Sequence, residues 1–186
     1  MAKTHRATLA ALVMTVLACT SAAAASNVAG DVDVSSGAVP LIRVRGATAR
    51  LDEVISGAVA RSATFRGLLD SIVTTDGIVY IVEGQCPQGV RACLLTFVAI
   101  AGPYRLLRIV VDPRKSDDDL MGSIGHELQH AIEVLSNHYI RTSAAATLRL
   151  KQICNVCGPR FETKAAVKAG DTIRAELRNT EPFAHH

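Results

Sequence analysis

The feature that most constrains the fold is a long amphipathic segment from Ser116 to Asn137, which predicts a single helix. Ser116 is suited to cap the N-terminus, and three aspartates follow it, where the helix dipole favours negative charge. Apolar residues recur with helical spacing and form one stripe, made of Leu120, Ile124, Leu128, Ala131, Ile132 and Leu135. We therefore expect this helix to pack its apolar stripe against the core.

The same segment contains the sequence His126-Glu127-Leu128-Gln129-His130. Two histidines four residues apart lie one turn apart on the same helix face, so both imidazoles can bind one metal ion. Glu127 between them is placed to take a proton from a metal-bound water. At about 100° per residue, the histidines lie roughly opposite the apolar stripe. The pattern predicts one zinc ion per chain, bound on the face of the helix that points away from the core.

A catalytic zinc site needs a third protein ligand beside the two histidines. The metzincin spacing would require Gly and His at positions that hold Glu133 and Ser136, and His138 does not fit that spacing either. A Glu on a later helix is the remaining common arrangement. Glu162 is the candidate, because it opens a predicted helix over 161–177 whose alanines permit close approach of a neighbouring helix.

In these residues the sequence resembles the gluzincin class of zinc metallopeptidases, and in size it is similar to small bacterial members. The resemblance covers the expected strands, the motif helix and the last helix. It implies His126, His130 and Glu162 as metal ligands and Glu127 as general base in the hydrolysis of a peptide or amide bond. Members often carry an Asp four residues after the ligand Glu, in support of a histidine. Here that position is Ala166, so the supporting partner stays open.

Several roles around the motif also stay open. Glu162 can be a favourable first-turn charge instead of a ligand. Glu133 lies on the histidine face, where it can support a histidine or be solvated. Four residues are candidates for stabilising an oxyanion, namely Tyr104, His138, Tyr139 and Arg160.

The rest of the chain predicts an α+β fold. Two helices are expected between 48 and 73, with Ser62 capping the second, and a further helix over 143–150. A short strand is expected at 41–45. Three apolar runs predict a small antiparallel three-stranded meander that leads into the motif helix, over 78–82, 94–100 and 104–111. An exposed edge of that sheet would bind an extended peptide beside the metal.

The N-terminal region predicts export. A basic start, an apolar run over 7–19 and three alanines at 23–25 are typical of a cleaved signal peptide over 1–25. We favour this over a lipoprotein signal with anchoring at Cys19. Small and polar residues then predict a flexible leader over 26–46, followed by one domain over 47–186. The processed protein would be periplasmic or secreted, with no transmembrane segment left after signal removal.

Cysteine usage agrees with an oxidising compartment, because four cysteines remain after removal of the signal. We expect Cys86 to pair with Cys93 across a Pro/Gly loop, and Cys154 to pair with Cys157. A redox-active Cys-x-x-Cys would need a thioredoxin-like strand before it, and none is predicted.

Charge and motif together limit the function classes. Loss of residues 1–25 removes two basic residues and no acidic ones, so the formal charge falls from +3 to +1. Such a chain lacks the basic surface that nucleic-acid binding needs. We expect a peptide or protein substrate. The alternatives are a catalytically silent zinc-binding domain, or an adaptor domain of the cell envelope in which the two histidines coincide by chance.

Overall fold

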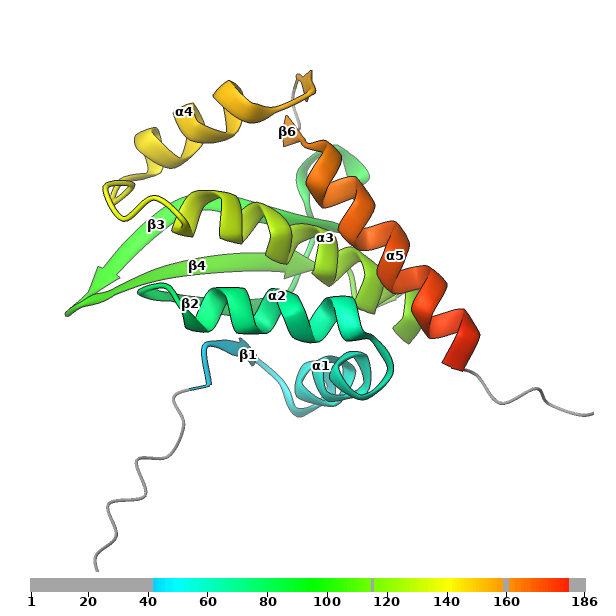
Figure 1. The fold of residues 1–186 in the computed structure, drawn as a ribbon. Coiled ribbons are helices and arrows are strands. Elements are labelled where there is room, and N and C mark those ends of the chain that lie inside the picture. The colour runs from blue at the N-terminus through cyan, green and yellow to red at the C-terminus, as the bar shows by residue number, and fades with distance from the viewer. Residues whose placement is uncertain (1–41, 115, 159–160, 181–186) are drawn as a thin grey trace, which may run out of the picture. The chain divides into compact units, whose positions relative to one another are not determined.

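One mixed sheet of four strands organises the described part of the chain. The computed structural model describes residues 42–114, 116–158 and 161–180 (Figure 1). In spatial order the sheet contains β1 (Val44–Gly46), β2 (Gly77–Glu83), β4 (Tyr104–Val111) and β3 (Ala92–Ala101). β1, β2 and β4 are parallel, and only β3 runs antiparallel to its neighbour. β1 falls inside the range 26–46 that the sequence suggested as leader, where a short strand was also expected.

The α+β class is confirmed, but the antiparallel three-stranded meander is wrong. The three predicted strands exist, yet β4 lies between β2 and β3 and pairs with β2 in parallel. The reason is burial. In β4 alternate side chains are buried, including Ile109 and Val111 at 0% exposure, as befits a central strand. β3 lies at an edge of the sheet, where Phe97 and Ile100 are exposed.

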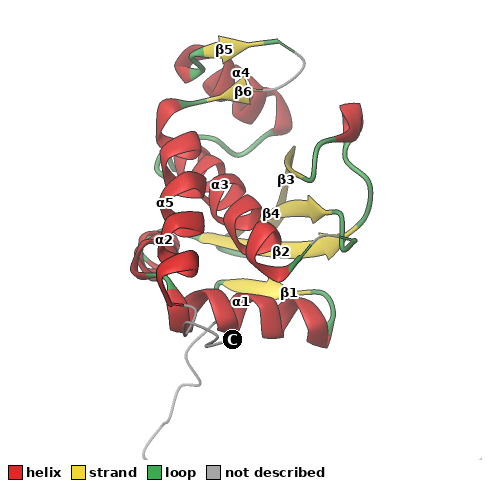
Figure 2. Cartoon of the chain, turned by 90° about the vertical axis from the view of Figure 1, so that its right-hand side faces the viewer, coloured by secondary structure: helices red, strands yellow, loops and turns green. Residues whose placement is uncertain are grey.

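Helices cover one face of this sheet. α1 (Ala49–Arg61) and α2 (Ala63–Val73) join β1 to β2, as a parallel connection requires. Ser62 is the N-cap of α2 and accepts a hydrogen bond from the backbone N–H of Phe65, as predicted. α3 (Asp117–Leu135) is the predicted motif helix, capped by Ser116. It lies between the sheet and α5 (Lys164–Thr180), as Figure 2 shows. α4 (Ser143–Ile153) packs against β3.

The last helix begins later than predicted. Phe161–Glu162 form a short strand, β6, which pairs with β5 (Val156–Cys157) in a two-stranded hairpin. Thr163 is buried and its hydroxyl accepts a hydrogen bond from the backbone N–H of Ala166, so it fills the capping position before α5. Glu162 therefore lies in a strand that precedes the helix and not in the first turn of the helix.

The histidine face of α3 is covered, contrary to the expectation of an open face. α5 packs directly on it, because glycines replace side chains at the contact. A Cβ atom at Gly125 would lie 2.1 Å from Cδ1 of Ile173 on α5, and one at Gly170 would lie 3.2 Å from Cβ of His126. Helices with such small residues at the contact approach closely. The motif residues consequently lie inside the protein, at the edge of a pocket.

Both predicted disulfides are present. Cys86 is bonded to Cys93, and Cys154 to Cys157. These two pairs are compatible with an oxidising environment. Among the described residues, no helix has the length and apolar character that crossing a membrane demands. The expected signal peptide over 1–25 and the leader up to residue 41 lie outside the described residues.

Candidate metal centre

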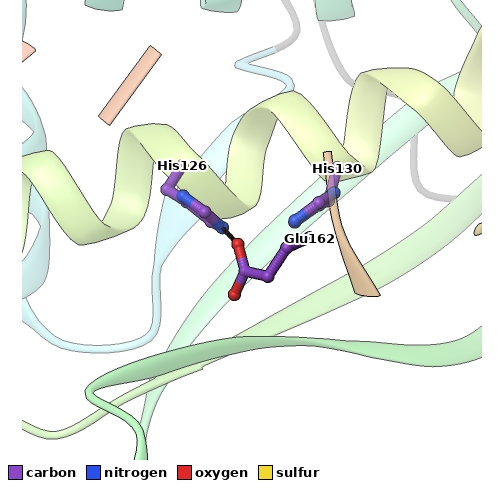
Figure 3. Close-up of side chains that lie close together, drawn as sticks. All are labelled: His126, His130 and Glu162. Carbon is purple, nitrogen blue, oxygen red and sulfur yellow. Dashed lines mark ion pairs between the residues drawn. The ribbon is translucent and has the colours of Figure 1, made fainter. Parts of the chain in front are cut away.

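Two imidazoles and one carboxylate converge at the pocket edge. His126 and His130 lie on successive turns of α3, and Glu162 reaches them from β6 (Figure 3). One possible ligand atom from each lies within 4.8 Å of the other two. Nε2 of His126 lies 3.2 Å from Oε2 of Glu162. The two imidazole rings meet edge to face, with centroids 4.9 Å apart. The structure thus brings together the three residues that the sequence suggested as ligands.

The hairpin β5–β6 fixes the backbone of Glu162. Val156 pairs with Glu162 in the hairpin, and the N–H of Asn155 donates to the carbonyl of Glu162 at 2.8 Å. The side chain of Asn155 in turn accepts from the N–H of Lys164 at 2.8 Å. The disulfide between Cys154 and Cys157 closes the other arm of the hairpin. This local network holds Glu162 although it does not belong to a long helix.

Glu127 lines the same pocket as the three converging residues. Its side chain is buried, and one carboxylate oxygen accepts a hydrogen bond from the backbone N–H of Leu94 on β3 at 2.7 Å. Burial raises the pKa of the Glu127 carboxyl, and neither the nearby His130 nor the Leu94 N–H offsets this effect fully. A carboxylate with a raised pKa is a better proton acceptor than an ordinary exposed one.

The two histidines differ in their electrostatic surroundings. Burial lowers the pKa of His126, and the neighbouring His130 lowers it further. Burial also acts to lower the pKa of His130, but the hydrogen bond to Glu133 and the adjacent carboxylates outweigh it, so that pKa is raised. A metal ligand must be a neutral imidazole. The lowered pKa of His126 favours the neutral form that binds a metal, whereas the raised pKa of His130 makes a proton a stronger competitor for that ring.

Glu133 is the partner of His130. Its Oε2 lies 2.8 Å from Nδ1 of the imidazole, and its Oε1 accepts from the hydroxyl of Thr163 at 2.6 Å. Because Nδ1 is engaged, Nε2 is the nitrogen left for a metal. The sequence left the role of Glu133 open between support and solvation, and its hydrogen bonds assign it to the support of His130. Ala166, at the position where the resemblance suggested a carboxylate, is fully buried.

The pocket beside these residues has a volume of about 540 Å³. Its lining includes Ala92 to Thr96 of β3, the two histidines of α3 and Glu162 of β6. Arg174 of α5 adds a positive charge to the lining, and its guanidinium donates to the hydroxyl of Ser123 at 3.3 Å. The pocket is within the size range of ligand-binding sites in proteins.

The three donors fit zinc. Tetrahedral zinc with bonds of about 2.0–2.1 Å places its ligand atoms about 3.4 Å apart. The His126–Glu162 pair is already at 3.2 Å. Since no two of the ligand atoms are more than 4.8 Å apart, any pair has to approach by at most about 1.4 Å, which rotation of the side chains can supply. Two nitrogens and one carboxylate oxygen are also the donors that catalytic zinc sites use.

The three oxyanion candidates that belong to the described residues, Tyr104, His138 and Tyr139, do not line this pocket. Tyr139 is 80% exposed, and His138 lines a different pocket. Tyr104 stacks beneath the guanidinium of Arg43, and Arg160 lies outside the described residues.

Three contributors to the site were missed from the sequence. The capping role of Thr163 had a usable signal, a threonine directly before a helical run. The approach of Arg174 and of the Leu94 N–H had none, because each depends on how distant elements pack.

Comparison with known proteins assigns no relative: no family model, curated protein or solved structure matches the chain. The case for a function therefore rests on the residues of this chain.

Proposed function

We propose that this protein is an exported zinc-dependent hydrolase of peptide or amide bonds. The observation that carries the proposal is the convergence of His126, His130 and Glu162 at one pocket, with Glu127 in its wall. The three converging residues would hold zinc, and Glu127 would act as general base. Zinc in such a site lowers the pKa of a coordinated water and polarises a substrate carbonyl.

The protein groups divide the work as follows. Glu127 accepts the proton of the attacking water and passes it to the leaving amine. Its raised pKa suits both steps, because the carboxyl must take up a proton and release it again. The hydrogen bond from Leu94 holds the carboxylate against the pocket wall. Arg174 of α5 lines the pocket near enough to His126 to lower its pKa, and this positive charge favours a substrate group that is negative or becomes negative.

A peptide substrate is supported by the position of β3. This strand is an edge strand of the sheet, and its residues Ala92 to Thr96 line the pocket. Because the N–H of Leu94 points to Glu127, the carbonyl of the same residue points to the same open side of the strand. That carbonyl can accept a hydrogen bond from an extended peptide added along the edge. The two disulfides and the sequence of residues 1–25 support export.

The test combines zinc content with peptide hydrolysis. Purified residues 26–186 should hold one zinc per chain and cleave a mixed peptide library. Glu127→Gln keeps an oxygen for the Leu94 N–H but cannot accept a proton, so it should keep zinc and lose about 10²–10⁴-fold in kcat. Glu176→Gln is the matched control, because Glu176 is also hydrogen-bonded, to Ser62 and Thr64, away from the pocket.

The outcomes separate the alternatives. Zinc without hydrolysis in the wild type would favour the catalytically silent domain. No zinc after metal supplementation would favour the adaptor interpretation. Hydrolysis that survives Glu127→Gln would refute the assignment of the general base.

A further inference from the structure

The carboxylate of Glu133 joins two parts of the candidate site that are distant in sequence. One oxygen accepts from Nδ1 of His130 at 2.8 Å, and the other accepts from the hydroxyl of Thr163 at 2.6 Å. All three side chains are shielded from solvent, at 11%, 5% and 4% exposure for Glu133, His130 and Thr163. Both oxygens are therefore hydrogen-bonded, one to the ring of His130 and the other to the residue that precedes α5.

Thr163 uses its hydroxyl in both directions. It donates to Glu133 and accepts from the backbone N–H of Ala166, which fixes the start of α5. Thr163 directly follows Glu162 in the chain. A hydroxyl held by two partners restricts the backbone of its own residue. It thereby also restricts the backbone of the neighbouring Glu162, from which the carboxylate extends.

We propose that Glu133 and Thr163 are positioning residues that align His130 and Glu162 on the same metal ion. Glu133 holds the His130 ring with its proton on Nδ1 and Nε2 toward the pocket. Thr163 ties the strand that carries Glu162 to the helix that carries the histidines. This inference rests on the proposed metal site and names the partners that align its ligands. Outer partners of this kind are part of a metal site, because they fix the tautomer and orientation of each ligand.

Packing alone does not explain this arrangement. A shielded carboxylate costs free energy unless hydrogen bonds and charge offset the loss of water. An apolar side chain at 133 would fill the space between α3 and α5 without that cost. The carboxylate is useful where it is because it reaches the ring of one proposed ligand and the residue next to another.

The first test is zinc affinity, measured by competition with a chromophoric chelator. Glu133→Ala should weaken zinc binding by about 10–100-fold. Glu133→Gln keeps one oxygen for His130 and an amide that can donate to Thr163, so its loss should be smaller. Thr163→Val should weaken binding by about tenfold or more, and Thr163→Ser, which keeps the hydroxyl, should restore it.

The control is Thr142→Val. Thr142 caps α4 just as Thr163 caps α5, with its side chain accepting from the N–H of Ala145 at 3.2 Å. Loss of either cap costs the helix a similar free energy. Of these two threonines, only Thr163 is hydrogen-bonded to Glu133. Thr142→Val should therefore destabilise the fold without changing zinc affinity. Equal zinc affinity in the wild type, Glu133→Ala and Thr163→Val would overturn the proposal.

A second readout needs no metal. In the metal-free protein, at a pH where the ring is neutral, nitrogen NMR should find the His130 proton on Nδ1 in the wild type and on Nε2 in Glu133→Ala. An unchanged tautomer would overturn the role of Glu133. If the wild type binds no zinc, the proposed function fails, and this measurement still decides whether Glu133 sets the orientation of His130.

Discussion

Arg105 holds the C-terminal end of the helix that carries both histidines, and its removal should be among the most damaging single changes in the protein. The side chain is 1% exposed. Its guanidinium is paired with Asp76 and donates to backbone carbonyls of Leu135, Asn137 and Ile140, at 2.7, 2.8 and 3.0 Å. The carbonyls at the end of a helix lack partners within the helix. Arg105 supplies those partners and offsets their negative charge.

The magnitude for Arg105→Met follows from these contacts. The methionine fills much of the volume but leaves the carbonyls and the Asp76 carboxylate without their donor. Removal of one partner of a buried ion pair costs about 3–5 kcal/mol, against a total stability of about 5–15 kcal/mol. With a urea m-value of about 2 kcal/mol/M, the midpoint should fall by about 1.5–2.5 M. The loosened end of α3 should also weaken zinc binding, since Glu133 lies in its last turn.

The assay is urea unfolding followed by circular dichroism, with Arg141→Met as control. Arg141 approaches Asp76 at only 3.8 Å and is 46% exposed, so its loss should cost about 0–1 kcal/mol. The reasoning would be refuted if Arg105→Met shifted the midpoint no more than Arg141→Met does.

Three further perturbations test neighbouring parts of the argument. Burial acts to raise the pKa of Asp76, but the hydrogen bond and charge of Arg105 lower it overall. Ionised Asp76 should therefore stabilise the fold above about pH 4, and this contribution should be lost as the pH falls below that value. The urea midpoints of the wild type and Asp76→Asn should accordingly differ above about pH 4 and converge below it. In Gly125→Ala the new methyl group should clash with Ile173 and push α3 and α5 apart. The free energy of unfolding, measured in urea, should fall by about 1–3 kcal/mol. Zinc binding should also weaken in the chelator competition. Replacing Cys154 and Cys157 with serine should lower the free energy of unfolding by only about 2 kcal/mol, because the loop that the disulfide closes is short. Since this disulfide closes the hairpin that carries Glu162, zinc binding should also weaken in the chelator competition.

Local patterns in the sequence were enough for most of the elements. The apolar stripe and the acidic first turn located α3, and Ser62 marked the break between α1 and α2. Turn residues located β3 and β4, and the Pro/Gly loop indicated the pairing of Cys86 with Cys93. These features depend on neighbours within a few residues, which is why periodicity, caps and turns suffice to predict them.

The strand order and the covered histidine face needed information that a local pattern does not contain. β3 and β4 form the expected hairpin, but which of the two strands pairs with β2 depends on which can be buried on the helix side. Likewise, the apolar stripe of α3 indicated one packed face, and the alanines of the last helix suggested a close neighbour without locating the contact on α3. The histidine face is packed because Gly125 and Gly170 leave room for α3 and α5 to contact each other closely. The positions of these two glycines form no sequence pattern that would predict such a contact.

The cost of burying this cluster argues against a coincidental motif. Glu127, His130 and Glu133 are shielded from water, and His126 and Glu162 are only partly exposed. In the core of a small domain such groups lose hydration, and apolar residues of similar size would be neutral or more stabilising. Surface histidines at helical spacing carry no such cost. Polar groups gathered at one pocket, with the pKa values of His126 and Glu127 shifted by burial, are typical of functional sites. The energetic argument therefore favours a site that uses these groups over an adaptor domain that tolerates them.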